Sequence, residues 1–156
     1  MSKRTPTFGY EDNVQISKRE IAETQLVEAI SLFLSGNYVC AITLAGAAEE
    51  IFARLVNAQG ATSAVESSFE VIQTIREKIG LEAVGEKPKK TIFNEWNAAR
   101  NELKHCDKDA VDKITINLFD EACWMIRRAL ANAMKIEVQI SNAVDFENWI
   151  IININL

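Results

Sequence analysis

Apolar residues recur at helical spacing along most of the chain, while glycine and proline fall between the periodic segments. The first periodic segment spans 18–35 and stops at Gly36. It follows Ser17, which together with Glu20 has the Ser-x-x-Glu form of a capping box. The pattern therefore predicts a first helix over 18–35, preceded by an irregular segment over 1–16.

A second helix is predicted over 37–58, and it is the most apolar part of the chain. Of the 19 residues from Tyr38 to Val56, 14 are apolar, which is typical of a helix buried on nearly all sides. Gly46 lies in its middle, where glycine costs up to about 1 kcal/mol relative to alanine. We attribute this glycine to the close approach of a neighbouring helix.

Three further helices follow from the same spacing. We expect them over 63–79, 91–105 and 109–140, with Asp109 as the cap of the last and a loop over 81–90. Trp96, Trp124 and Trp149 lie in periodic segments, which favours the core or a dimer interface over base stacking.

The tail over 141–156 is ambiguous, because Asp145 can cap a short helix whereas residues 152–156 alternate like a strand. We predict a short helix with a frayed end. The fold class is then all-α: an antiparallel bundle of four to five main helices with a short C-terminal helix, forming one domain over 1–156 with its helical core at 17–140.

Composition agrees with one globular domain and restricts its partners. At 156 residues, folding removes about 68–70% of the unfolded surface from water, so a core forms without disulfides or metal. The chain carries 17 Lys and Arg against 22 Asp and Glu, a net charge of −5. This acidity argues against indiscriminate binding to nucleic acid or to an anionic membrane.

The cysteines and the chain start point to a cytoplasmic protein. Cys40, Cys106 and Cys123 are odd in number and form no C-x-x-C pair, which is typical of reduced thiols. With one histidine, they offer no zinc-site spacing, so we expect no metal. No apolar stretch follows the basic start, and none is long enough to cross a bilayer, so neither a secretory signal nor a membrane partner is expected.

One cluster of residues, 97–107, carries the chemistry that the rest of the chain lacks. It contains the lone histidine, His105, with Arg100 five positions earlier and Lys104 beside it. Between Lys87 and Lys108, six basic residues stand against three acidic ones, a net charge of +3, so the remainder of the chain carries −8. A local basic region on an acidic protein draws a polyanion to one place.

The segment Arg100-Asn101-Glu102-Leu103-Lys104-His105 resembles the R-x(4–6)-H motif of the HEPN superfamily (higher eukaryotes and prokaryotes nucleotide-binding), in which a polar residue follows the arginine. The resemblance implies a small helical bundle, often a homodimer. Many members are metal-independent endoribonucleases of toxin–antitoxin or phage-defence systems, and others are non-catalytic binding or regulatory modules.

The resemblance also implies site residues. It makes Arg100 and His105 the active-site pair and Asn101 a supporting polar group, with Lys104 as a further substrate-binding candidate. Members often have a polar residue on an earlier core helix facing the motif, for which Glu49 or Glu50 is available, and we include Glu50 among the substrate-binding candidates. Some toxins carry a tyrosine two positions after the histidine, where this chain has Asp107, a carboxylate that would repel an RNA phosphate.

The chemistry of metal-free RNA cleavage suits these residue types. A base must take the 2′-OH proton, an acid must protonate the leaving oxygen, and a guanidinium can hold the phosphate through a bidentate fork. One histidine cannot easily serve as both base and acid, but a two-fold dimer supplies two. The expected partners are therefore a second copy of the chain, an RNA or nucleotide and, for a toxin, an antitoxin protein.

Two further interpretations remain open. Positions i and i+5 lie about 140° apart on a continuous helix, so Arg100 and His105 converge only if the helix ends near Lys104 or if a partner chain completes the site. His105 can also be an ordinary residue at a helix C-terminus, where its positive form suits the helix dipole, with Arg100 on a solvated face. In that case the protein is a binding module or a purely structural helical domain.

Overall fold

The protein is an all-α fold, as the hydrophobic pattern predicts. The computed structural model describes residues 8–9, 13–80, 85–105 and 113–154, which form six helices and no strand. The helices are α1 (Lys18–Leu34), α2 (Tyr38–Ala58), α3 (Ala64–Ile79), α4 (Lys89–Glu102), α5 (Leu118–Lys135) and α6 (Ala143–Asn153). None of these helices is both long enough and apolar enough to span a membrane.

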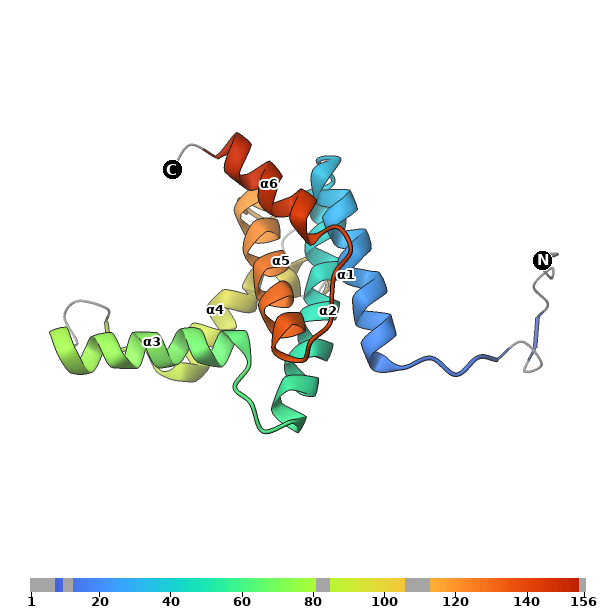
Figure 1. The fold of residues 1–156 in the computed structure, drawn as a ribbon. Coiled ribbons are helices and arrows are strands. Elements are labelled where there is room, and N and C mark those ends of the chain that lie inside the picture. The colour runs from blue at the N-terminus through green and yellow to red at the C-terminus, as the bar shows by residue number, and fades with distance from the viewer. Residues whose placement is uncertain (1–7, 10–12, 81–84, 106–112, 155–156) are drawn as a thin grey trace.

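The core is built from α1, α2 and α5, with the short C-terminal helix α6 packed across one end of them (Figure 1). An aromatic cluster joins these helices around Phe33, whose ring centroid lies 5.1 Å from that of Phe146 and 5.3 Å from that of Trp149. Phe33, Phe52 and Phe146 are almost completely buried. Burial of such side chains contributes roughly 1.5–3 kcal/mol each, so this cluster holds α6 to the bundle.

Helices α3 and α4 project from the bundle as an arm (Figure 1). The two helices touch through Phe69 and Phe93, whose rings meet edge to face at 6.0 Å, while Lys89 lies over both rings and 3.8 Å from Glu66. Only Ala64 of α3 is buried, and Ile79 is 71% exposed. The apolar face of α3 therefore packs on its neighbours in the arm and not in the central core.

The helix starts show where local chemistry overrides apolar spacing. The predicted capping box is confirmed: the Ser17 hydroxyl accepts from the Glu20 backbone N–H at 3.0 Å, and the Glu20 carboxylate accepts from the Ser17 backbone N–H at 2.9 Å.

The predicted start of the fifth helix is wrong. Described residues 113–117 are not helical, and α5 begins after Asn117, whose side chain accepts from the Asp120 N–H at 3.2 Å. Asp109 lies outside the described residues.

Candidate functional site

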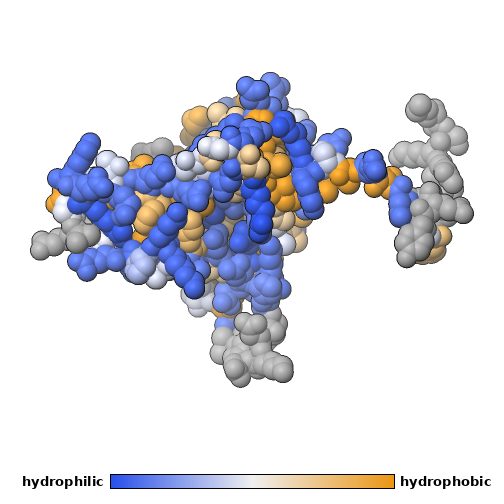
Figure 2. Space-filling view, turned by 90° about the horizontal axis from the view of Figure 1, so that it is seen from below, coloured by the Kyte–Doolittle hydropathy of each residue, from blue (hydrophilic) through white to orange (hydrophobic). Residues whose placement is uncertain are grey.

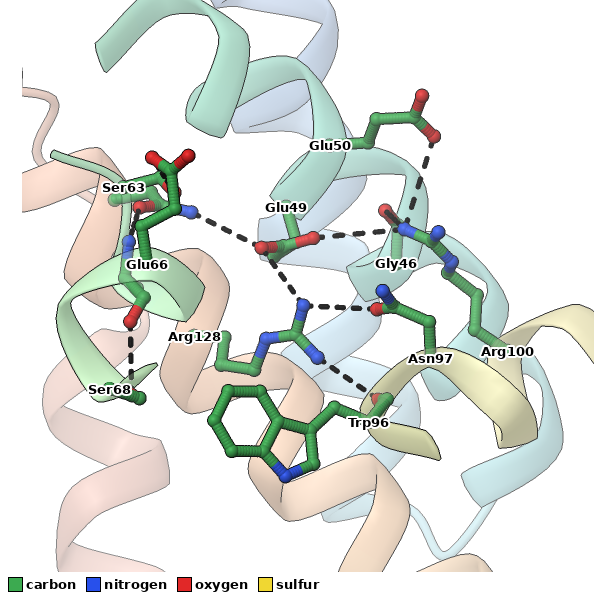
Figure 3. Close-up of polar contacts among 12 residues, drawn as sticks. Gly46, Glu49, Glu50, Ser63, Glu66, Ser68, Trp96, Asn97, Arg100 and Arg128 are labelled. Carbon is green, nitrogen blue, oxygen red and sulfur yellow. Dashed lines mark hydrogen bonds and ion pairs between the residues drawn. The ribbon is translucent and has the colours of Figure 1, made fainter. Parts of the chain in front are cut away.

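A buried carboxylate on α2, Glu49, lies where α2, α4 and α5 meet (Figure 3). Only 3% of Glu49 is exposed. Two guanidinium groups approach it from opposite sides, that of Arg128 from α5 and that of Arg100 from α4. An unpaired carboxylate at this depth would carry a large desolvation penalty, so both arginines stabilise its charged form.

Arg128 holds the three helices together. Its Nη2 lies 3.2 Å from Glu49 Oε1 and donates to Asn97 Oδ1 at 3.0 Å, while its Nη1 donates to the Trp96 carbonyl at 3.1 Å. The Arg128 side chain is 14% exposed, so these contacts are only weakly screened by water. One guanidinium therefore connects the carboxylate of α2 to the backbone and side chain of α4.

Asn132 extends this polar cluster toward α3. It is fully buried, its amide donates to Glu49 Oε1 at 3.4 Å, and its carbonyl oxygen accepts from the Ala64 N–H at 2.7 Å. The Ala64 N–H is one of the first-turn donors of α3, which have no partner within the helix. Asn132 therefore supplies the cap that Ser63 does not provide, since Ser63 makes no side-chain cap bond.

Arg100 lies directly over Gly46, the glycine in the middle of α2. A Cβ placed on Gly46 would collide with Cγ and Cδ of Arg100, so the glycine admits the arginine side chain. This confirms that Gly46 serves the close approach of a neighbouring helix, namely α4. Arg100 Nη1 lies 3.7 Å from Glu49 Oε2 and 3.9 Å from Glu50 Oε2 and donates one long hydrogen bond, of 3.4 Å, to the Gly46 carbonyl.

The contacts of Arg100 are looser than those of Arg128. Both side chains are 14% exposed, yet Glu49 is 0.5 Å closer to Arg128, at 3.2 Å against 3.7 Å. The Nε atoms of both arginines are buried and have no hydrogen-bond partner among the described residues, so the difference lies in their Nη contacts. Because the distances to Glu49 and Glu50 exceed hydrogen-bond length, the Arg100 guanidinium keeps donors that an incoming anion could use.

Helix α4 ends at Glu102, within the motif. The Asn101 carbonyl accepts from the N–H groups of both Lys104 and His105 at 3.1 Å, and the bond to His105 has the i→i−4 spacing of an α-helix. The backbone therefore stays close to the helical path up to His105, so the end of α4 does not by itself bring His105 round to Arg100. The side chains of Asn101, Lys104 and His105 are exposed to solvent at this end of α4.

The structure brings some of the candidate residues together and leaves others apart. Arg100 and Glu50 approach to 3.9 Å, and Glu50 also pairs with Arg54 at 3.2 Å. Within the described chain, no hydrogen bond or ion pair joins the side chain of His105 to Arg100. Asp107 lies outside the described residues.

The cysteines do not form a metal centre in the part of the chain that the structure describes. Cys40 is exposed on α2, whereas Cys123 is buried in α5, and burial raises the pKa of the Cys123 thiol. No group of three or more His, Cys, Asp or Glu side chains able to hold a metal occurs there. Cys106 falls outside the described residues.

Comparison of the chain with protein-family models, curated proteins and solved structures finds no match. The site is therefore defined by its geometry alone. Sequence reasoning gave no role to Arg128, Asn97 and Asn132, although Arg128 and Asn132 lie four positions apart in a helix whose other residues between them are apolar. That spacing places them on one helix face and is a detectable signal of a buried polar cluster.

Proposed function

We propose that this chain is a HEPN-like, metal-independent endoribonuclease that acts as a two-fold dimer, of the kind found in toxin–antitoxin and phage-defence systems. The observation that carries the proposal is the state of Arg100. It is held in place over Gly46 by its packing, yet its guanidinium makes one long hydrogen bond of 3.4 Å among the described residues, whereas that of Arg128 makes two, of 3.0 and 3.1 Å.

Arg100 is the proposed phosphate-binding residue. A phosphate oxygen accepting from its free donors gains charge-assisted hydrogen bonds without the cost of ordering the side chain, since Gly46 and Glu49 already fix it. Glu49 is shared by Arg100 and Arg128, and with Glu50 beside Arg100 the two guanidiniums and two carboxylates balance in formal charge. Glu49 and Arg128 are therefore positioning residues, and Arg100 is the group that would touch the substrate.

His105 is the proposed proton-transfer residue, with Asn101 and Lys104 beside it at the exposed end of α4. The dimer is motivated by the lack of any hydrogen bond or ion pair between the side chains of His105 and Arg100 in the described part of the chain. An isologous contact at this end of α4 would place two Arg100 and two His105 residues around one cleft, so that one histidine acts as base and the other as acid.

A second candidate function is a non-catalytic HEPN-like module that binds a nucleotide or a protein partner. The observation that favours it is the acidic surrounding of Arg100, where Glu49 and Glu50 lie 3.7 and 3.9 Å from Nη1. These carboxylates compete with a scissile phosphate. In this case Arg100 still binds an anion, but His105 takes no part in chemistry.

Cleavage of single-stranded RNA by the purified chain in EDTA tests the proposal. The variants are Arg100→Ala and His105→Ala, and Lys78→Ala is the control because it removes an exposed charge from the far end of α3. We expect metal-independent cleavage by the wild type and by Lys78→Ala, and loss of cleavage in the other two variants.

Nucleotide binding, measured as a thermal shift, separates the two candidate functions. A nucleotide-dependent shift that Arg100→Ala abolishes, without RNA cleavage by any form of the protein, supports the binding module and rejects the nuclease. Equal cleavage by the wild type and His105→Ala identifies a contaminating ribonuclease and also rejects the nuclease. Absence of both cleavage and a nucleotide shift rejects the nuclease and the nucleotide-binding form of the module.

A further inference from the structure

A groove of about 780 Å³ lies between the arm and α5, away from the exposed end of α4. Its walls are apolar, formed by Val65 and Ile72 of α3, Trp96 of α4, and Trp124 and Ala131 of α5. Trp124 is 63% exposed, so of the two places expected for this indole it does not lie in the core, and a dimer interface stays a prediction. A large exposed indole in an apolar groove is typical of a binding surface.

The groove has an acidic end and a basic end. Glu121 and Lys135 both line it and lie 14 residues apart on α5, which corresponds to about 21 Å along the helix axis. Arg127 and Arg128, between them in the sequence, also line the groove, and they are paired with Glu147 and Glu49. Burial and the neighbouring Asp120 raise the pKa of Glu121. Among the described residues neither Glu121 nor Lys135 forms an ion pair. The Lys135 ammonium donates to the Thr62 carbonyl at 2.6 Å and to the Ser67 hydroxyl at 2.8 Å, so one of its three N–H donors is left for a partner.

The chain also has an exposed apolar segment that nothing covers within the described residues. Before α1 the backbone is not helical, and Val14 and Ile16 are 81% and 54% exposed. Two residues apart on an extended backbone, they point to the same side. Figure 2 shows orange atoms along this extension, which stands clear of the body of the molecule, while the arm lies on the other side.

The charges and length of this segment complement the groove. In the sequence, the acidic Glu11 and Asp12 precede the apolar pair, and the basic Lys18 and Arg19 follow it. The six steps from Asp12 to Lys18 span about 20 Å when extended, close to the separation of the two charged ends of the groove. An antiparallel placement along α5 sets the basic end against Glu121, the acidic end against Lys135, and the apolar pair against Trp124.

We propose that the segment around Val14 and Ile16 of one copy of the chain docks in the α3–α4–α5 groove of a second copy. The extension leaves α1 on the side of the molecule opposite the arm (Figure 1), which favours a second copy over the groove of the same chain. Two copies can exchange their segments reciprocally, burying apolar surface that is exposed in each alone.

Sedimentation equilibrium of the full chain tests this exchange. Val14→Asp combined with Ile16→Asp, and separately Trp124→Ser, should each weaken self-association by about tenfold or more, equivalent to about 1.4 kcal/mol. The control is Val71→Asp, at an exposed α3 residue that does not line the groove, and it should associate like the wild type. Sedimentation measures association directly, so the result does not depend on ribonuclease activity.

A charge exchange keeps the test informative if a variant is merely unstable. Glu121→Lys should weaken association, and adding Lys18→Glu with Arg19→Glu should restore it, since acidic residues are tolerated in the first turn of α1. A synthetic peptide of residues 8–19, added to the Val14→Asp/Ile16→Asp chain, should change the emission of Trp124. A peptide with the same two Asp substitutions should not.

Three results overturn the proposal. The first is that the wild-type chain stays monomeric, whether or not the peptide binds. The second is that the Val14 and Ile16 substitutions leave self-association unchanged. The third is that Val71→Asp and Trp124→Ser weaken self-association equally. Failure of the charge exchange to restore association, while Glu121→Lys remains folded, overturns the antiparallel docking.

Discussion

The contact between Gly46 and Arg100 gives the sharpest test of how the site is assembled. In Gly46→Ala, the new methyl group meets Cγ and Cδ in the middle of the arginine side chain, and not its flexible end. The side chain must then change rotamer, which moves the guanidinium away from Glu49 and from the Gly46 carbonyl. The substitution therefore displaces Arg100 without removing any of its atoms.

The magnitude follows from two opposing effects. Alanine is favoured over glycine inside a helix by about 1 kcal/mol. Overpacking costs about 1–3 kcal/mol. We therefore expect Gly46→Ala to lower the free energy of unfolding by up to about 2 kcal/mol in the wild-type background. In the Arg100→Ala background the collision is absent, so the same substitution should raise stability by up to about 1 kcal/mol.

Urea denaturation of the wild type, both single variants and the double variant measures this coupling as a double-mutant cycle. Our account predicts a coupling free energy of about 1–3 kcal/mol. Additivity of the two substitutions within about 0.5 kcal/mol would refute the packing of Arg100 on Gly46. A third variant, Arg100→Lys, retains the stem of the side chain and should keep most of the coupling.

Three other predictions concern the buried polar cluster and the start of α1. Glu49→Ala leaves two arginines around an empty position and should lower the free energy of unfolding by about 3–5 kcal/mol in urea denaturation. The control, Glu50→Ala, should change the free energy of unfolding by less than about 0.5 kcal/mol. Equal effects of the two substitutions would contradict the burial of Glu49. Asn132→Leu leaves the Ala64 N–H without an acceptor and should cost about 1–3 kcal/mol, with faster amide exchange at the start of α3; unchanged exchange there would exclude the cap. Hydrogen bonds from Ser17 lower the pKa of Glu20 below 4.5, so the stabilisation that they give is present above the pKa of Glu20 in the unfolded chain and is lost as the pH falls through its pKa in the folded chain. The difference in thermal stability between the wild type and Ser17→Ala should therefore shrink in acid. A difference that stays constant from pH 7 to acid would contradict the capping box.

The helices were largely predictable because their signals are local. Ser17 and Glu20 form the predicted cap, and α2 matches the apolar run from Tyr38 onward. The start of α5 was not predicted, because Ile114 and Leu118 fit a helical spacing. The alternation of Ile114, Ile116 and Leu118 also fits an extended chain, and the N-cap at Asn117 sets the start of α5.

The site was only partly predictable because burial depends on tertiary packing. Glu49 and Glu50 are neighbours in the sequence, and about 100° of helix rotation separates them. Glu49 is buried between two arginines, whereas the side chain of Glu50 is 47% exposed. The spacing of Arg128 to Asn132 is the one local sign that separates it from Arg127, and only Arg128 turns toward Glu49.

The central claim is that His105 transfers protons in a metal-free cleavage of RNA, and the rate of that cleavage in EDTA tests it most directly. A positioned general acid or base contributes about 10²–10⁴-fold to a rate. The account predicts that His105→Ala, folded and dimeric like the wild type, loses at least about 100-fold in rate. A His105→Ala protein that cleaves RNA at the wild-type rate, or a wild-type dimer that cleaves none, would contradict it.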